Sequence, residues 1–142
     1  MSARVAVVVG NPKSRSRTHA AAVHLATEIA GATQSHLEVV RTELARFRGR
    51  CVRGSGEGML ATFDGPARAV RCATAIVRAL RPLGLDVRAG VHTGEVEVEG
   101  DRVRSVAVDI AAWIAAEAAP GEVLVSQTVK DIVAGSGLEL VD

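Results

Sequence analysis

The sequence predicts an α+β fold, in which a sheet of mostly antiparallel strands carries helices packed on one side, related to the ferredoxin-like plan. Three observations support this. β-branched runs alternate with segments of helical periodicity in the order strand, helix, helix, strand, strand, helix, strand, strand, helix, strand. Glycine and proline separate these segments. Hydrophobic residues make up 48% of the 142 residues but aromatic residues only 2%, so Ala, Val, Leu and Ile must build the core.

The N-terminal part is expected to begin with a buried strand, Arg4 to Val9, which ends in a turn at Gly10-Asn11-Pro12. A helix is expected next, with Thr18 as its cap and Gly31 at its end. A second helix is expected to run from Thr33 to Gly49, with four apolar residues at helical spacing (Leu37, Val40, Leu44 and Phe47).

The middle of the chain predicts two strands joined by a glycine-rich turn, at residues 51–53 and 58–63. A third helix is expected to start at Pro66 and to stop at Pro82 and Gly84. Its inward face is expected to carry Val70, Ala73, Ile76, Val77 and Leu80, and its outward face Arg68, Arg71, Arg78 and Arg81.

The C-terminal part predicts a pair of strands, Val87 to Val91 and Glu95 to Glu99. A fourth helix is expected from about Ser105 to Ala118, burying Val106, Ile110 and Ile114. A strand from Glu122 to Val125 and a short helix from Gln127 to Val133 are expected to follow.

Composition excludes several classes of function. The formal net charge of +1 gives no electrostatic reason to expect nucleic acid or an anionic membrane as a partner. Arg or Glu interrupts every long apolar segment, so no membrane span is expected. Cys51 and Cys72 lack CxxC spacing and favour a reduced, cytoplasmic protein over a disulfide scaffold.

Four stretches of the sequence form an ordered set of motifs. They are Val52-Arg53-Gly54-Ser55-Gly56-Glu57-Gly58, Val87-Arg88-Ala89-Gly90-Val91-His92-Thr93-Gly94-Glu95, Val108-Asp109-Ile110-Ala111-Ala112-Trp113 and Ala119-Pro120-Gly121-Glu122-Val123-Leu124-Val125-Ser126. Their order resembles that of the motifs in the catalytic domains of class III adenylate/guanylate cyclases. Residues from about 36 to 140 therefore resemble that family. The resemblance implies a nucleotide-cyclase-like sheet, truncated at its C-terminal end, where the family's closing strand hairpin would follow.

The resemblance also implies where metal and nucleotide would bind. Family members hold two metal ions with one Asp on the opening strand and another in a Gly-Asp-Gly turn, which reads Gly56-Glu57-Gly58 here. Glu57 is thus the candidate ligand for Mg²⁺ or Mn²⁺, with a solvated turn residue as the alternative. No counterpart of the opening-strand Asp precedes Phe47. The base-recognising positions correspond to Arg53 and, approximately, Arg102.

The family's transition-state pair, an Asn and an Arg four residues later, corresponds to Asp109 and Trp113. An i, i+4 pair shares one face of a helix. A carboxylate there would repel phosphate, and an indole cannot stabilise phosphoryl charge as a guanidinium does. The alternative for Trp113 is packing in a core or an interface.

The N-terminal segment carries a second resemblance. Residues Val7 to Thr18, within a match of about Arg4 to Gly31, resemble the opening strand, loop and helix start of flavodoxin-like NAD(P)H-dependent FMN reductases. In that family the loop wraps the flavin phosphate. The resemblance implies phosphate contacts from the start of the predicted helix. The candidate residues are Ser14, Ser16, Arg17 and Thr18.

The expected organisation is one domain over residues 1–142, with residues 1–32 of flavin-reductase type and 33–142 as the cyclase-homology body. The expected function is that of an impaired or inactive cyclase domain, which binds nucleotide or dimerises in cyclic-nucleotide signalling. The candidate ligands are ATP and GTP, and the candidate partners a second copy or another cyclase-type domain. The alternatives are a weakly active adenylate/guanylate cyclase using Mg²⁺ or Mn²⁺, and a module that binds FMN or phosphate through residues 10–18.

Overall fold

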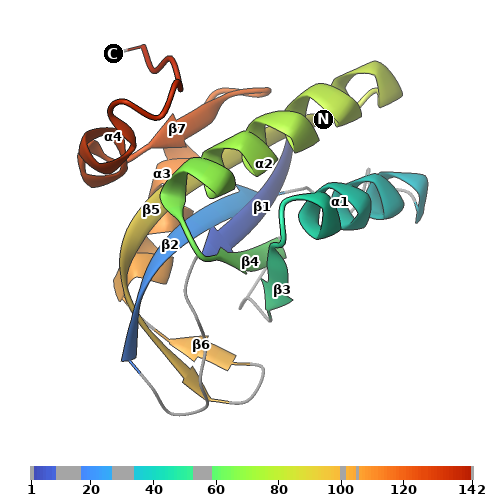
Figure 1. The fold of residues 1–142 in the computed structure, drawn as a ribbon. Coiled ribbons are helices and arrows are strands. Elements are labelled where there is room, and N and C mark those ends of the chain that lie inside the picture. The colour runs from blue at the N-terminus through green and yellow to red at the C-terminus, as the bar shows by residue number, and fades with distance from the viewer. Residues whose placement is uncertain are drawn as a thin grey trace.

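The structure, a computed structural model, places helices on both faces of one mixed sheet (Figure 1). It describes residues 2–8, 17–26, 34–52, 59–99, 102–104 and 106–141. α1 and α2 cover one face of the sheet and α3 the other. The predicted α+β class is confirmed, but the helices do not all lie on one side.

The sheet follows the order β3-β4-β1-β2-β5-β6, and β7 pairs with β5 off this path. Five of the pairings between described strands are antiparallel. Three are parallel, since β1 runs parallel to β4 and to β5, and β7 runs parallel to β5. The strands are β1 (Ser2–Val8), β2 (Arg17–Ala26), β3 (Arg50–Val52), β4 (Met59–Phe63), β5 (Asp86–Glu99), β6 (Arg102–Arg104) and β7 (Val123–Val125).

The predicted helix after Thr18 is wrong over the residues described there. β2 is a strand that pairs antiparallel with both β4 and β5, with Val23 opposite Ala61 and Thr18 opposite Val96. Alanine-rich sequence favours a helix only weakly, and the hydrogen bonds that two neighbouring strands offer outweigh that preference. The predicted helix end at Gly31 lies outside the described residues.

The predicted strand pair at residues 87–99 is one continuous strand, β5, of 14 residues. Gly94 does not turn the chain, because it pairs with Ala20 within the ladder to β2. The change of direction comes later, since the end of β5 pairs antiparallel with β6.

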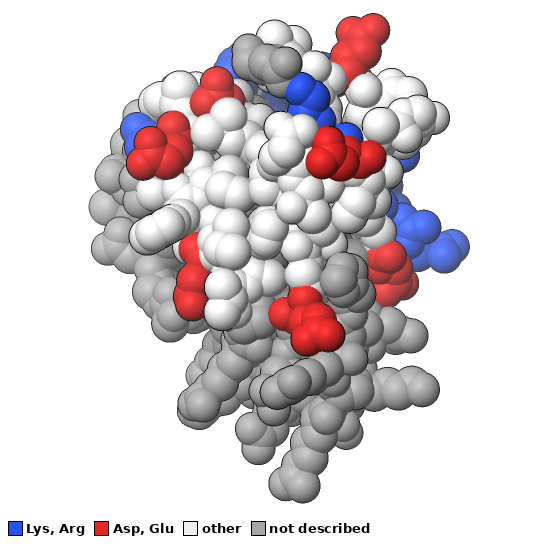
Figure 2. Space-filling view, turned by 90° about the vertical axis from the view of Figure 1, so that its left-hand side faces the viewer, with Lys and Arg blue, Asp and Glu red and all other residues white. Residues whose placement is uncertain are grey.

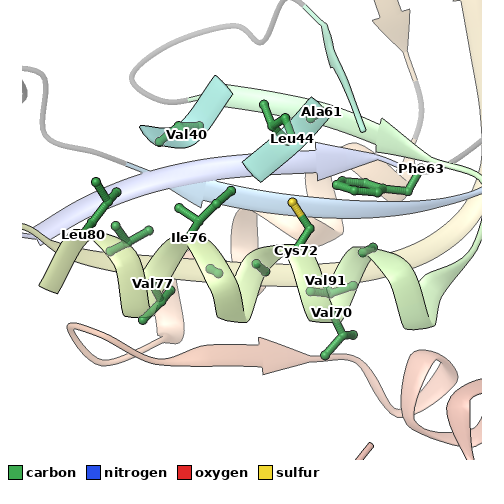
Figure 3. Packing of buried hydrophobic residues seen from close by; sticks show 14 of the residues in the cluster. Val40, Leu44, Ala61, Phe63, Val70, Cys72, Ile76, Val77, Leu80 and Val91 are labelled. Carbon is green, nitrogen blue, oxygen red and sulfur yellow. The ribbon is translucent and has the colours of Figure 1, made fainter. Parts of the chain in front are cut away.

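The main core lies between the sheet and α1 (Gln34–Arg46) and α2 (Pro66–Leu80), as Figure 3 shows. Every predicted inward residue of α2 is buried, and Ile76 and Leu80 are fully so. A short 3₁₀ turn, η2 (Arg81–Leu83), ends this helix, and Gly84 follows with φ +81°. Each fully buried Leu or Ile stabilises the fold by roughly 1.5–3 kcal/mol.

Both cysteines are free. Cys51 is exposed on β3, whereas Cys72 is buried in α2. Burial, with the nearby Glu43 carboxylate adding to it, raises the pKa of the Cys72 thiol to about 12. Cys72 therefore acts as a small core side chain rather than as a nucleophile.

α3 (Val106–Glu117) packs closely on the second face of β5, through small residues. A Cβ atom placed at Gly90 would lie 2.4 Å from the Ala111 carbonyl oxygen and 2.4 Å from the Ala115 nitrogen. One at Gly94 would lie 2.9 Å from the Ala107 Cβ. The three alanines are buried in this contact.

The predicted buried face of α3 is therefore displaced by one residue. Val106 is 72% exposed, while Ile110 and Ile114 are half-buried. The glycines of β5 let the helix backbone approach so closely that only alanine fits beneath it. The larger apolar side chains must point sideways or outward.

The last two predicted elements are confirmed. β7 lies within the predicted range, and α4 spans Gln127–Val133. The Ser126 side chain caps α4 by accepting a hydrogen bond from the Val129 backbone N–H.

Candidate functional site

The outward face of α3 carries the two described residues at predicted catalytic positions, Asp109 and Trp113. Both side chains are exposed, and Trp113 is 79% exposed. Their i, i+4 spacing puts them on one stripe of the helix, which Val106 and Glu117 extend at either end. Trp113 does not pack in the core of this chain, so of the two packing alternatives an interface remains.

A hollow of about 640 Å³ opens beside Trp113, between α3 and β7. Its lining is mainly apolar and consists of Trp113, Ile114, Ala116, Glu117, Leu124 and Val125. Glu117 is the single charged residue among those described in this lining. The hollow can take an apolar group, with a carboxylate at its edge.

On β5, His92 lies between Gly90 and Gly94, the two glycines that contact α3. Its Nδ1 atom is 2.7 Å from the Ser126 Oγ atom, so the pair ties β5 to the start of α4. Partial burial lowers the pKa of His92 below its ordinary value. The neutral imidazole is therefore favoured in the folded chain.

A larger hollow, of about 1200 Å³, lies on the α2 side of the sheet. Arg71, Arg78 and Lys130 face it together with Glu43 and Glu122. Among the described residues that line it, none is a predicted site residue. The predicted site and the larger hollow thus lie on different sides of the sheet.

No family model matches the chain. Comparison with curated proteins finds a relative. The relative is "Putative adenylate cyclase 3" from Rhizobium meliloti (strain 1021), 31% identical over 114 residues. The match covers 74% of this chain and 19% of the relative. The chain thus spans about a fifth of the curated relative it matches.

Solved structures agree on the fold. The adenylate/guanylate cyclase/hydrolase from Silicibacter pomeroyi superposes with a TM-score of 0.68 at 23% identity, covering 92% of this chain and 79% of that one. A Trypanosoma brucei adenylate cyclase in its monomeric state gives a TM-score of 0.72 at 16% identity, covering 89% and 80%. The chain has the fold of an adenylate/guanylate cyclase catalytic domain.

This cyclase fold leaves several predicted site residues without a described position. Arg53, Glu57, Ser14 and Ser16 lie outside the described residues. Arg102 opens β6, where only its backbone is described. The structure therefore brings together Asp109 and Trp113, and leaves their distances to the other candidates open.

The predicted flavin-phosphate site loses its structural basis. Arg17 and Thr18 lie in β2, so Thr18 does not cap a helix. The proposed anion site depended on free backbone N–H groups at a helix N-terminus. The flavodoxin-like reading of residues 4–31 is accordingly not supported.

β1 and β2, the strands between β4 and β5, supply no carboxylate for a two-metal cyclase site. The opening-strand carboxylate of the family would come from this place in the sheet, but the sequences of β1 and β2 contain no Asp or Glu. Among the described residues, no group of three or more His, Cys, Asp or Glu is arranged to hold a metal ion.

One feature of this cyclase fold was not anticipated from the sequence, although a signal for it exists. Gly90 and Gly94 are four residues apart on one face of a strand, and Ala107, Ala111 and Ala115 repeat every four residues on a helix. Matched periods of small residues indicate close packing of helix on strand.

Among the helices of the described residues, none is long and apolar enough to cross a membrane.

Proposed function

We propose that this chain is a class III cyclase-homology domain that has lost the chemistry of nucleotide cyclisation and serves as a nucleotide-binding or pairing module in cyclic-nucleotide signalling. The observation that carries the proposal is the exposed pair Asp109 and Trp113 on one stripe of α3. The resemblance places the Asn and Arg of active cyclases at these two positions.

The substituted side chains oppose the reaction for separate reasons. Cyclisation requires attack of the ribose 3′ oxygen on the α-phosphorus, with positive charge near the transferring phosphoryl group. The exposed Asp109 carboxylate adds negative charge instead. Trp113 offers a single N–H donor and no charge, whereas a guanidinium offers five donors.

The metal donors support the same reading. Mg²⁺ and Mn²⁺ prefer carboxylate oxygens, and the resemblance supplies only Glu57, one methylene longer than the Asp of the family. A displacement of about 1 Å can cost on the order of a hundredfold in rate. Residual activity, the alternative function, would thus require Glu57 and a second carboxylate from elsewhere.

Pairing is the role that the remaining surface favours. Trp113 and the adjoining hollow expose apolar area on the helix that, in the family, contributes to the partner's nucleotide site. Partner candidates are a second copy or another cyclase-type domain, and ATP or GTP are the candidate ligands. A partner that supplies metal ligands and an Arg would complete what this chain lacks.

The test is detection of cyclic AMP and cyclic GMP by mass spectrometry after incubation with ATP or GTP and Mn²⁺. We expect no product from folded protein. Product that disappears in Glu57→Ala would contradict the proposal and establish the weakly active cyclase. Calorimetric titration with ATP and GTP then separates a nucleotide-binding module from a pairing module.

A further inference from the structure

The segment that follows α4 lies against the body of the molecule without joining the sheet. Residues 135–141 belong to no helix or strand, and in Figure 1 they lie beside β7, beyond the end of α4. Their burial alternates, since Ser136, Leu138 and Leu140 are half-buried and the residues between them are exposed. The two leucines pack against the main core. We call residues 135–141 the strap, because one side of this segment covers apolar surface.

A side chain of α2 is hydrogen-bonded to the strap. The Arg71 guanidinium donates from Nη2 to the Ser136 carbonyl oxygen at 2.8 Å, in an exposed contact. The Ser136 N–H donates to the carbonyl oxygen of Val133, the last residue of α4. Among the described residues, residues 137–141 make no hydrogen bond to another backbone group. A segment with unbonded backbone and few buried side chains opens locally at a lower free energy than the whole domain.

The Ser136 hydroxyl disfavours the arrangement in which the strap lies against the core. Its Oγ atom is buried, and among the described residues it has no hydrogen-bond partner. A buried hydroxyl without a partner loses the hydrogen bonds that water gives it, which costs free energy. Release of the strap returns this hydroxyl to water and so removes that cost.

Two glycines, one on each side of Ser136, can act as hinges. Gly135 has φ +83° and Gly137 has φ +87°, a left-handed conformation that favours glycine. A Cβ atom added at either position would meet no atom within 4 Å, so no neighbouring atom crowds the backbone there. Glycine tolerates large changes of φ and ψ, so the strap can swing at these two positions without disturbing α4.

The strap forms one wall of the larger hollow, the one of about 1200 Å³, and α2 and β7 line other walls. The charged residues of the lining are of both signs and include Arg71, Arg78, Lys130, Glu122 and Glu139. Figure 2, which views the molecule from the side of α4, likewise shows acidic and basic side chains scattered over a mostly uncharged surface. Because both signs of charge line the hollow, its charge selects neither an anion nor a cation. The surface that the strap covers is thus distinguished by its apolar side chains.

We propose that the strap is a cover that opens at Gly135 and Gly137 while the rest of the fold stays intact. Loss of the hydrogen bond from Arg71 to Ser136 releases it, its two leucines leave the core, and the hollow loses a wall. The apolar lining on α2 and β7 is then exposed to solvent. This conformational change goes beyond the function proposed above, because it takes place on the opposite side of the sheet from α3.

The strap contains one glutamate, Glu139, at which a glutamate-specific protease cuts a locally opened chain. Cleavage there removes residues 140–142 and is identified by mass. The cleavage rate follows the population of the open strap, so we expect it to stay nearly constant across urea concentrations well below the unfolding midpoint. A rate that rises with urea in step with global unfolding, followed by circular dichroism, would show that the strap belongs to the cooperative core and would overturn the proposal.

A matched pair of variants tests the hydrogen bond from α2. Arg71→Ala is expected to raise the cleavage rate at Glu139 about three- to tenfold, since it removes a charge-assisted hydrogen bond to the strap. The control, Arg78→Ala, removes the same side chain from an exposed position on the same helix, beside the same hollow, and is expected to leave the rate unchanged. Circular dichroism verifies that both variants fold. Equal rates for the two variants would contradict the release of the strap by loss of this bond, and with it the proposal.

Discussion

The two faces of β5 are packed in opposite ways. Toward α2 the strand presents Val87, Ala89 and Val91, all fully buried among larger apolar side chains. Toward α3 it presents Gly90 and Gly94, whose bare backbone almost touches the helix. Burial of apolar area stabilises the packing of α2 on β5, whereas close contact between backbones stabilises the packing of α3 on β5.

This difference explains why α3 exposes two large apolar residues. A helix packed through alanines fully buries none of its large side chains: Ile110 and Ile114 are half-buried, and Val106 and Trp113 point outward. α2 buries its large residues and exposes arginines instead. The α2 layer therefore buries its large apolar side chains, while the α3 layer leaves two of its own exposed.

The largest effect is expected from truncating the α2 layer. Ile76→Ala removes a fully buried side chain and should lower the free energy of unfolding by about 3–4 kcal/mol, through lost burial and a cavity. Urea denaturation measures it. Ile132→Ala, at a 51% exposed site on α4, is the control and should cost less than about 1 kcal/mol.

Substitutions that add a side-chain atom to β5 should destabilise its contact with α3. Gly90→Ala forces a Cβ against backbone atoms of α3 and should cost about 2–3 kcal/mol in the same measurement. Gly94→Ala meets only the Ala107 side chain and should cost less. Gly65→Ala, with no atom near the added carbon, should cost least. A reversed order would show that close approach does not hold α3.

Ser126→Ala tests the tie between β5 and α4. It removes the α4 cap and the hydrogen bond to His92, and should lower the free energy of unfolding by about 1 kcal/mol. Thr128→Ala, exposed on the same helix, serves as control. Equal costs for the two changes would mean that the cap contributes nothing measurable.

Trp113→Ala should leave stability within about 0.5 kcal/mol of the wild type, since the side chain is 79% exposed. A large loss of stability would place Trp113 in the fold itself and weaken the contrast between the layers. Because the variant lacks tryptophan, circular dichroism rather than fluorescence follows its urea denaturation.

The smallest effect concerns pH. Because burial lowers the folded-state pKa of His92, the unfolded chain takes up this proton first as pH falls below about 6.5. Stability should therefore decline from about pH 6.5 to the lowered folded-state pKa, with no contribution from His92 above that range. His92→Gln should flatten this decline in urea midpoints measured between about pH 7.5 and 5. Parallel profiles for the two proteins would contradict the assignment.

Sequence reasoning succeeded where local pattern and tertiary packing agree. The inward face of α2 repeats large apolar residues at helical spacing, and the structure buries all of them. It failed at β2, where alanine-rich sequence with helical character lies in a sheet, and at Gly94, which continues a strand. Both depend on partners distant in sequence, which a local pattern does not contain.

The predictions for the candidate site also divide into those that a local pattern supports and those that depend on distant residues. The order of motifs was enough to predict the cyclase fold, and helical spacing was enough to place Asp109 and Trp113 on one stripe. The exposure of Trp113 could not be predicted, because it follows from two glycines on a different element. Glu57, Arg53 and Arg102 remain predictions from motif position alone.

The glycine-lined face of β5 also matters while the chain is being synthesised. α2 precedes β5, so Val87, Ala89 and Val91 find their cover as soon as the strand emerges. α3 follows β5, so the glycine-lined face of β5 stays uncovered until α3 has been synthesised. Valines there would invite misassociation of the nascent chain. Gly90, His92 and Gly94 offer far less apolar surface there than valines would.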